Sequence, residues 1–228
     1  EILIPQGNQF TSFGSMKNFI SYLANGTDIK KNFELMAVKR KSTGVELHFN
    51  NNSKFQLKEN FLVFAMPQPQ VLRLLNNDFQ DISDLIQPVK MFAGVSGLFA
   101  FETPIKSRQS FIENHFIIGF HENSRIGQNF KLDCWTIHSK KVYGKKCSHF
   151  SKDQIKEQLL KEFRKLVSSD LPQPTYAEGH RWLYGFTEKA LNKNYIFHQP
   201  DRIGICGDWC RGDNALDASI SGTSLANK

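Results

Sequence analysis

The stretch that decides the fold is residues 203–227, IGICGDWCRGDNALDASISGTSLAN. It begins with a short apolar strand, continues through Gly207 and Asp208, and ends in a helix of small residues from about Asp213 to Asn227. This order predicts a carboxylate at the carboxyl end of a strand, just before a helix N-terminus. Such a carboxylate can accept hydrogen bonds from sugar hydroxyls, and the helix N-terminus favours an anion. An aspartate that only caps the helix would give the same pattern.

The first third of the chain predicts one helix followed by strands. Apolar residues recur at helical spacing in 15–25, so this segment is expected to be an amphipathic helix. Alternating apolar and polar residues in 33–41 and 45–50 predict a hairpin. The continuous apolar run 61–66, which ends at Pro67, predicts a strand buried on both faces.

Three further strands are expected at 91–101, 111–120 and 131–138, joined by polar loops that indicate an antiparallel sheet. Another strand is expected at 175–184. The clearest helix is 151–170, because it opens with the capping-box pattern Ser-x-x-Gln and carries one apolar stripe.

Composition limits the classes of protein that remain. Of the 228 residues, 40% are hydrophobic, which predicts a substantial core and excludes disordered and collagen-like chains. The longest near-apolar run, 91–101, is shorter than the roughly 20 residues of a membrane span. The net charge is 29 − 22 = +7, but the lysines are scattered. A basic nucleic-acid-binding module is therefore an alternative without a supporting motif, and we expect no nucleic-acid or membrane partner.

The four cysteines are too few and too dispersed for a disulfide framework. Cys206 and Cys210 lie four residues apart and Cys147 lies two before His149, so a zinc site is conceivable. We expect buried, reduced thiols, no metal, and a cytoplasmic location. The chain opens at Glu1 without Met and without a signal-peptide pattern, as expected of a segment that starts within a longer protein.

Residues 204–226 resemble the carboxyl-terminal flavin-binding segment of renalase-like FAD-dependent oxidoreductases, which belong to the flavin amine oxidase superfamily. Three further segments resemble family motifs in the expected order: SFGSMKNFISYLA (12–24), FLVFAMPQPQVLRLL (61–75) and HRWLYG (180–185). In the first of these, Ser15 stands where the family has Gly. Weaker resemblances occur at 122–128 and 135–138.

The resemblance implies an α/β fold, in which a partial FAD-binding, Rossmann-like domain is interleaved with an α+β substrate domain built on an antiparallel sheet. It assigns the FAD domain to 11–76 and 201–228, the substrate domain to 77–200, and residues 1–10 to the tail of an earlier substrate-domain segment. The family also has an N-terminal Gly-x-Gly-x-x-Gly unit for the adenosine and pyrophosphate. No Gly-x-Gly occurs in this sequence, so only the flavin side of the cofactor site is expected.

The resemblance further implies which residues contact FAD. Asp208 would accept hydrogen bonds from the ribityl chain, with Gly207 allowing close approach and Trp209 beside them. Pro67 would lie in the turn that leaves a neighbouring strand. The helix start would face the pyrimidine edge of the flavin and is formed by Asp213, Asn214 and Ala215. The family often has Arg-Val-Glu where this sequence has Asn214-Ala215-Leu216.

His180, Trp182 and Tyr184 are the candidate residues of the substrate cavity. They alternate along one expected strand, so they share one face. Ordinary aromatic packing would explain the same pattern. The resemblance implies hydride transfer from a dihydronicotinamide or an amine-like substrate to FAD, with O2 as the acceptor. The alternative is a noncatalytic remnant or incomplete gene product that does not hold FAD.

Overall fold

The computed structural model describes residues 3–6, 9–12, 16–75, 77–105, 111–124, 127, 129–168 and 170–228. The chain divides into two compact units, each formed by two separate stretches. The first unit contains residues 1–28 and 93–183, and the second contains residues 29–92 and 184–228. Strands β7 and β11 each contribute residues to both units.

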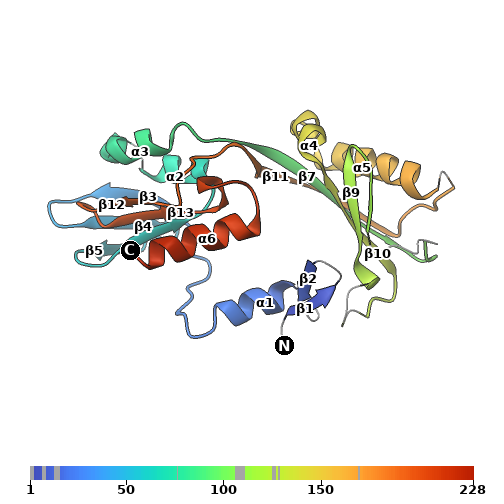
Figure 1. Ribbon diagram of the computed structural model, residues 1–228, viewed down its shortest axis with the longest axis horizontal. Coiled ribbons are helices and arrows are strands. Elements are labelled where there is room, and N and C mark those ends of the chain that lie inside the picture. The colour runs from blue at the N-terminus through green and yellow to red at the C-terminus, as the bar shows by residue number, and fades with distance from the viewer. Residues whose placement is uncertain are drawn as a thin grey trace. The chain divides into compact units, whose positions relative to one another are not determined.

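The first unit is built on a five-stranded antiparallel sheet with the order β11-β7-β10-β9-β8 (Figure 1). Its elements are the hairpin β1 (Leu3–Gln6) and β2 (Gln9–Ser12), α1 (Met16–Leu23), β7 (Lys90–Phe101), β8 (Phe111–Glu113), β9 (Ile117–His121), η2 (Glu122–Ser124), β10 (Asp133–Ser139), α4 (Lys141–Cys147), α5 (Lys152–Val167) and β11 (Tyr176–Lys189). The predicted antiparallel sheet is confirmed.

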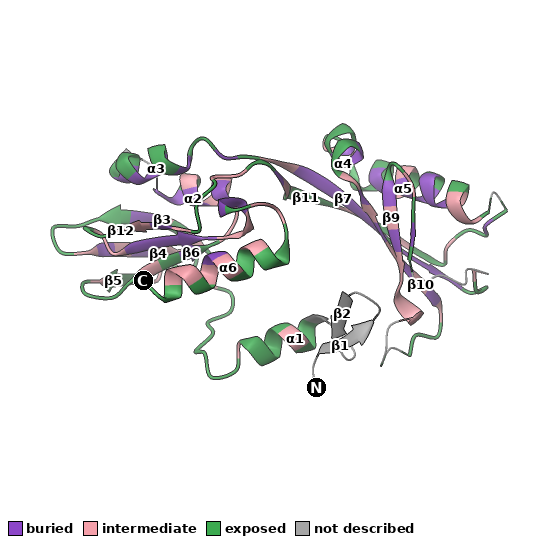
Figure 2. Ribbon diagram, in the orientation of Figure 1, coloured by how far each residue is buried: buried purple, intermediate pink, exposed green. Residues whose placement is uncertain are grey.

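Helices α4 and α5 cover one face of this sheet, and the buried residues gather between them and the strands (Figures 1 and 2). Strand β10 alternates strictly, with Trp135 and Ile137 buried and His138 half-buried. The predicted capping box of α5 is present, because Ser151 and Gln154 bond each other's backbone N–H. We call the opposite side of the sheet, away from α4 and α5, its second face.

The second unit combines two three-stranded sheets, β12-β13-β6 and β3-β4-β5. Strand β13 is parallel to β6 and antiparallel to β12. The elements are β3 (Leu35–Arg40), β4 (Val45–Phe49), β5 (Lys54–Leu57), β6 (Leu62–Ala65), α2 (Gln68–Leu75), η1 (Asn77–Phe79), α3 (Gln80–Ile86), β12 (Ile196–His198), β13 (Ile203–Cys206), η3 (Asp208–Cys210) and α6 (Ala215–Ala226).

The core of the second unit lies between the β3–β5 meander, helices α2 and α3, and one face of β13 and β6. Ile203 and Ile205 of β13 point into this core with Phe64 of β6. The intervening Gly204 faces α6, where a Cβ atom would lie 2.8 Å from the side chain of Leu225. The alternating side chains of β13 therefore separate the core from the helix.

Two expectations about the elements were wrong, and two helices were missed. The strand expected at 61–66 is not buried on both faces, because Val63 is 50% exposed. The strand expected at 111–120 is two strands, since Asn114 forms a turn and its side chain accepts from the N–H groups of Phe116 and Ile117. Helices α3 and α4 were not anticipated. None of the helices in the described part of the chain combines the length and apolar character that a membrane span requires.

Candidate functional site

The turn after β13 begins with a glycine whose place no larger residue can take. A Cβ atom on Gly207 would lie 2.7 Å from Nε1 of Trp209, closer than real contacts allow. The Trp209 indole is fully buried and donates from Nε1 to the carbonyl of Met66 at 3.0 Å. Met66 directly precedes Pro67. The indole thus fixes the turn after β13 to the turn after its parallel neighbour β6.

The carboxylate of Asp208 lies half-buried in this turn. Its Oδ1 accepts a hydrogen bond from the backbone N–H of Trp209 at 2.8 Å. Burial raises the pKa of the Asp208 carboxyl above its ordinary value, and the charges of Asp213 and Asp217 add to the rise. Among the described residues, no cation is paired with Asp208. The second carboxylate oxygen can therefore accept hydrogen bonds from a ligand.

Helix α6 begins beside the turn and presents its first residues to solvent. Asn214 is the N-cap, with its side chain accepting from the N–H of Asp217 at 3.0 Å. Ala215 is exposed, and Leu216 is 68% exposed. The predicted helix and its start near Asp213 to Ala215 agree with the structure.

Ser221 ties the middle of α6 to the turn, and sequence reasoning did not single it out. This fully buried hydroxyl accepts from the N–H of Gly207 at 3.1 Å and donates to the carbonyl of Asn194 at 2.5 Å. In the sequence, Ser221 is one small residue among several. Nothing in its spacing indicates a partner 27 residues earlier in the chain.

The structure thus brings together four of the predicted cofactor residues: Pro67, Gly207, Asp208 and Trp209. They occupy the edge at which the parallel strands β6 and β13 end. In open α/β sheets, ligands bind outside the carboxyl ends of parallel strands. Asp213, Asn214 and Ala215 follow at the start of α6.

Two of the predicted substrate-cavity residues lie together on the second face of the five-stranded sheet. The rings of His180 and Trp182 have centroids 4.3 Å apart and meet edge to face. Trp182 is 53% exposed. Tyr184 lies two residues further along the same strand. It is the first residue of the stretch 184–228, which belongs to the second unit. Arg181 points the other way and donates to the carbonyl of Ser148.

Two residues of this face, Ser96 and His138, were not among the predicted site residues. They are directly paired across β7 and β10, so their side chains share a face. Ser96 Oγ lies 2.7 Å from Nδ1 of His138, and the indole N–H of Trp182 donates to the same oxygen at 2.9 Å. The Phe120 ring meets His138 edge to face at 6.0 Å.

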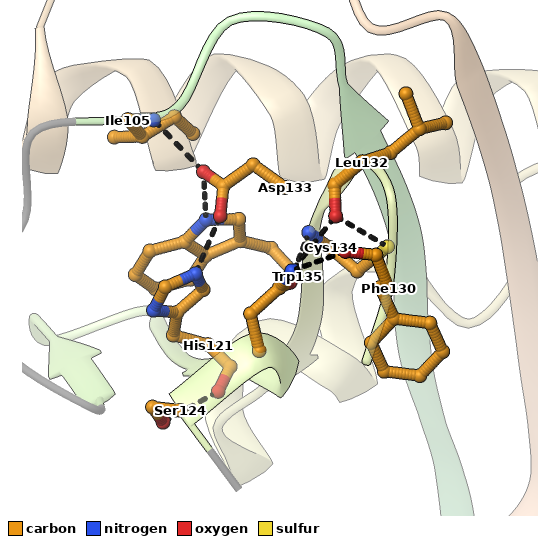
Figure 3. Close-up of polar contacts among 9 residues, drawn as sticks. Ile105, His121, Ser124, Phe130, Leu132, Asp133, Cys134 and Trp135 are labelled. Atoms are coloured by element: carbon orange, nitrogen blue, oxygen red, sulfur yellow. Dashed lines mark hydrogen bonds and ion pairs between the residues drawn. The ribbon is translucent and has the colours of Figure 1, made fainter. Parts of the chain in front are cut away.

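A second polar cluster surrounds Asp133, on the α5 side of the sheet (Figure 3). Its carboxylate accepts from the backbone of Ile105 at 2.8 Å and from the indole of Trp135 at 3.2 Å, and it lies 2.5 Å from Nε2 of His121. The imidazole of His121 stacks on the Trp135 ring. Both carboxylate oxygens are therefore engaged within the protein. The contact between His121 and Asp133 joins the end of β9 to the start of β10.

A third cluster offers possible metal ligands but already contains a cation. Ligand atoms of Asp81, His198 and Asp201 lie within 4.8 Å of one another. Arg40 pairs with both carboxylates, at 3.1 Å to Asp81 and 2.5 Å to Asp201. The guanidinium offsets one of the two negative charges and occupies oxygen atoms of both carboxylates. The cysteines near 206–210, considered as zinc ligands from the sequence, are free and buried.

Comparison with known proteins gives a family match over most of the chain. Residues 3–203 match the model of the family described as flavin containing amine oxidoreductase. Two solved structures share the fold. One is a protein from Exiguobacterium sp. described as a putative protoporphyrinogen oxidase, with a TM-score of 0.69 at 11% identity. The other is cyclohexylamine oxidase from Brevibacterium oxydans, with a TM-score of 0.66 at 10% identity.

These matches cover nearly all of this chain but only part of the solved proteins. The alignment includes 98% of this chain and 53% of the Exiguobacterium protein, and 97% of this chain and 54% of the Brevibacterium protein. The chain therefore spans about half the length of the structures that it matches. At this identity the likeness establishes the mixed α/β fold with its antiparallel sheet.

Proposed function

The chain belongs to the family of flavin-containing amine oxidoreductases, and from this premise we propose that it is part of an FAD-dependent oxidoreductase. The complete protein would transfer hydride from a small organic substrate to the flavin, with O2 as the final acceptor. The half-buried carboxylate of Asp208, at the carboxyl end of β13, is the observation that carries this proposal.

The residues of this turn fit the flavin half of the cofactor. Gly207 leaves the backbone open, and Asp208 has an oxygen available for a ribityl hydroxyl. The exposed start of α6 offers backbone N–H groups to the electron-rich edge of the ring system. The adenosine and pyrophosphate half has no counterpart here, because the sequence contains no Gly-x-Gly.

Bound FAD would supply the redox chemistry, as the electron acceptor for the substrate. The residues of this chain would hold and orient it. Asp208 would accept hydrogen bonds from the ribityl chain, and the N-terminal end of α6, from Asn214, would stabilise negative charge on the ring through a fixed dipole. Trp209 would keep the two turns in register by its bond to Met66.

We further propose that the second face of the five-stranded sheet belongs to the substrate site. His180 and Trp182 form an aromatic corner there, suited to a flat organic molecule. A dihydronicotinamide or an amine-like compound, as in renalase-like enzymes, is the substrate class that we expect. Direct hydride transfer requires no protein nucleophile.

Flavin occupancy tests the proposal. The purified intact protein should carry FAD, and Asp208→Ala should raise the Kd for FAD on the order of tenfold, the effect of losing a hydrogen bond to a charged acceptor, and so lower the flavin-to-protein ratio. Asp84→Ala, at an exposed position on α3, is the control and should leave the ratio unchanged. If the intact protein binds no flavin, the noncatalytic alternative holds. If only Asp208→Ala is without effect, the ribityl role is wrong.

A further inference from the structure

Three groups on the second face of the sheet form a hydrogen-bonded chain that neither the family match nor the sequence motifs assign. Trp182 of β11, Ser96 of β7 and His138 of β10 are joined through one oxygen atom, Oγ of Ser96. This oxygen belongs to a residue that is only 4% exposed. Its hydrogen bonds are therefore made to the protein and not to bulk water.

The donors and acceptors of this chain can be assigned from their chemistry. An indole nitrogen can only donate, so the Trp182 N–H occupies one acceptor site of the Ser96 hydroxyl. The hydroxyl has one proton of its own. Among the described residues, Nδ1 of His138 is the only acceptor within reach of it. Were Nδ1 protonated instead, the Ser96 proton would be buried without an acceptor, which is costly.

From this accounting we propose that Ser96 is a positioning residue, which donates to Nδ1 of His138 and so fixes that imidazole as the tautomer protonated at Nε2. The same oxygen holds the indole of Trp182 at the candidate substrate face. The residue would act through its two neighbours and not by touching the substrate. Its functional meaning rests on the proposed function, because that proposal makes this face part of the substrate site.

The tautomer can be read directly by nuclear magnetic resonance. The intact protein, labelled with 15N in its seven histidines, would be measured at alkaline pH, at which an ordinary imidazole is neutral. His138 is assigned by the signal lost in His138→Gln. We expect a proton on Nε2 of His138 and none on Nδ1. A proton on Nδ1 of His138 in the wild-type protein overturns the proposal.

Ser96→Ala provides the second readout. The variant should remove the hydrogen bond at Nδ1 of His138 and shift the 15N resonance of that atom, and it should speed hydrogen exchange of the Trp182 indole on the order of tenfold, through loss of its acceptor. The indoles of Trp135 and Trp209 donate to Asp133 and to the Met66 carbonyl, so they serve as internal references. Unchanged His138 and Trp182 signals in this variant would contradict the role of Ser96.

Ser139→Ala is the matched control. Ser139 is equally buried at 3% exposure, is the next residue after His138, and accepts from the N–H of Val95 on the opposite face. Ser139→Ala should leave the His138 and Trp182 signals unchanged. If it changes them as much as Ser96→Ala does, the effect of Ser96→Ala comes from general packing and not from its hydrogen bonds. None of these signals requires bound FAD. A protein without flavin refutes the proposed function alone, and a flavoprotein with the wrong His138 tautomer refutes the positioning role of Ser96 alone.

Discussion

At the residue scale, the carboxyl of Asp208 makes folding stability depend on pH. Burial raises its pKa in the folded state, and the carboxylates of Asp213 and Asp217 add to the rise, while the backbone N–H of Trp209 opposes it. As pH rises above the ordinary aspartate value of about 3.9, the unfolded chain loses this proton before the folded protein does. Stability therefore falls as pH rises through the range between the unfolded and folded pKa values, and it stays lower at neutral pH.

Asp208→Asn should consequently stabilise the protein at pH 7 while weakening its proposed hold on flavin. The amide oxygen can still accept from Trp209, so the gain should be about 1 kcal/mol in the free energy of unfolding, a usual size for stabilising single changes. Denaturant titrations at pH 7 and pH 3.5 would measure it, and the gain should shrink at the lower pH. Asp217→Asn should be destabilising instead, because it removes the partner of Arg211 and a negative charge in the first turn of α6. A loss of stability in Asp208→Asn at pH 7 would contradict this account.

What the sequence could predict at this scale depended on how local each contact is. Gly207 and Asp208 stand in a recognisable motif, and the structure places their turn beside the neighbouring turn that contains Pro67. The partners of Ser96 and Ser221 lie 42 and 27 residues away, respectively, in the chain. A serine in a strand or helix carries no local pattern that distinguishes such a bond from simple packing.

At the scale of single elements, local chemistry predicted α5 best. Its cap and its apolar stripe are both read within one segment, and the helix occupies 152–167. The burial of a strand was harder to predict, because it depends on which other elements pack against the strand. The apolar run around β6 was expected to be covered on both faces, yet Val63 is half-exposed. Strand β11 extends to Lys189, beyond the expected end at 184, since its pairing and not its composition sets its length.

The packing of α5 against β11 gives an element-scale prediction. A Cβ atom on Gly179 would lie 2.2 Å from the carbonyl oxygen of Lys152 and 2.8 Å from the N–H nitrogen of Lys156. These are backbone atoms of α5, so the helix would have to move. Gly179→Ala should therefore cost about 1–3 kcal/mol of unfolding free energy, as overpacking usually does.

Gly222 of α6 provides the opposite case. A Cβ atom there would meet nothing within 4 Å, and the residue lies inside a helix. Gly222→Ala should raise the free energy of unfolding by about 0.5–1 kcal/mol, because glycine loses more backbone entropy on folding. Chemical denaturation of both variants measures the contrast. Equal effects of the two substitutions would show that helix α5 does not press on β11 as the structure has it.

At the scale of the whole molecule, the chain forms two units, each assembled from two stretches that are distant in the sequence. The sequence predicted such interleaving through a family resemblance, because composition alone does not reveal which segments fold together. The assignment of 11–76 and 201–228 to a flavin domain and of 77–200 to a substrate domain remains a prediction. Its direct test is whether flavin contacts map to the second unit, which holds Asp208.

The sheet of the second unit leaves one parallel strand at its edge. In the order β12-β13-β6, strand β6 has a strand neighbour on one side only among the described residues. The surface beside it is apolar, with Phe61 62% and Val63 50% exposed. The same side chains line a groove of ≈ 500 Å³ that runs over the face of this sheet beside α6, with Phe197, Gly204 and Leu225 among its other residues. Unpaired, apolar edge strands of this kind promote pairing between chains.

We therefore expect this 228-residue chain, purified by itself, to self-associate through β6. Sedimentation velocity over a range of concentrations should show oligomers in the wild-type chain. Val63→Lys should weaken association by roughly tenfold or more, because a charge beside an edge strand opposes pairing with a second copy. Leu85→Lys removes a similarly exposed apolar side chain, at 43%, from α3 in the same unit, and it should associate like the wild type. A wild-type chain that stays monomeric, or a Leu85→Lys variant that dissociates as readily as Val63→Lys, would show that the edge of β6 is not the surface that joins the copies.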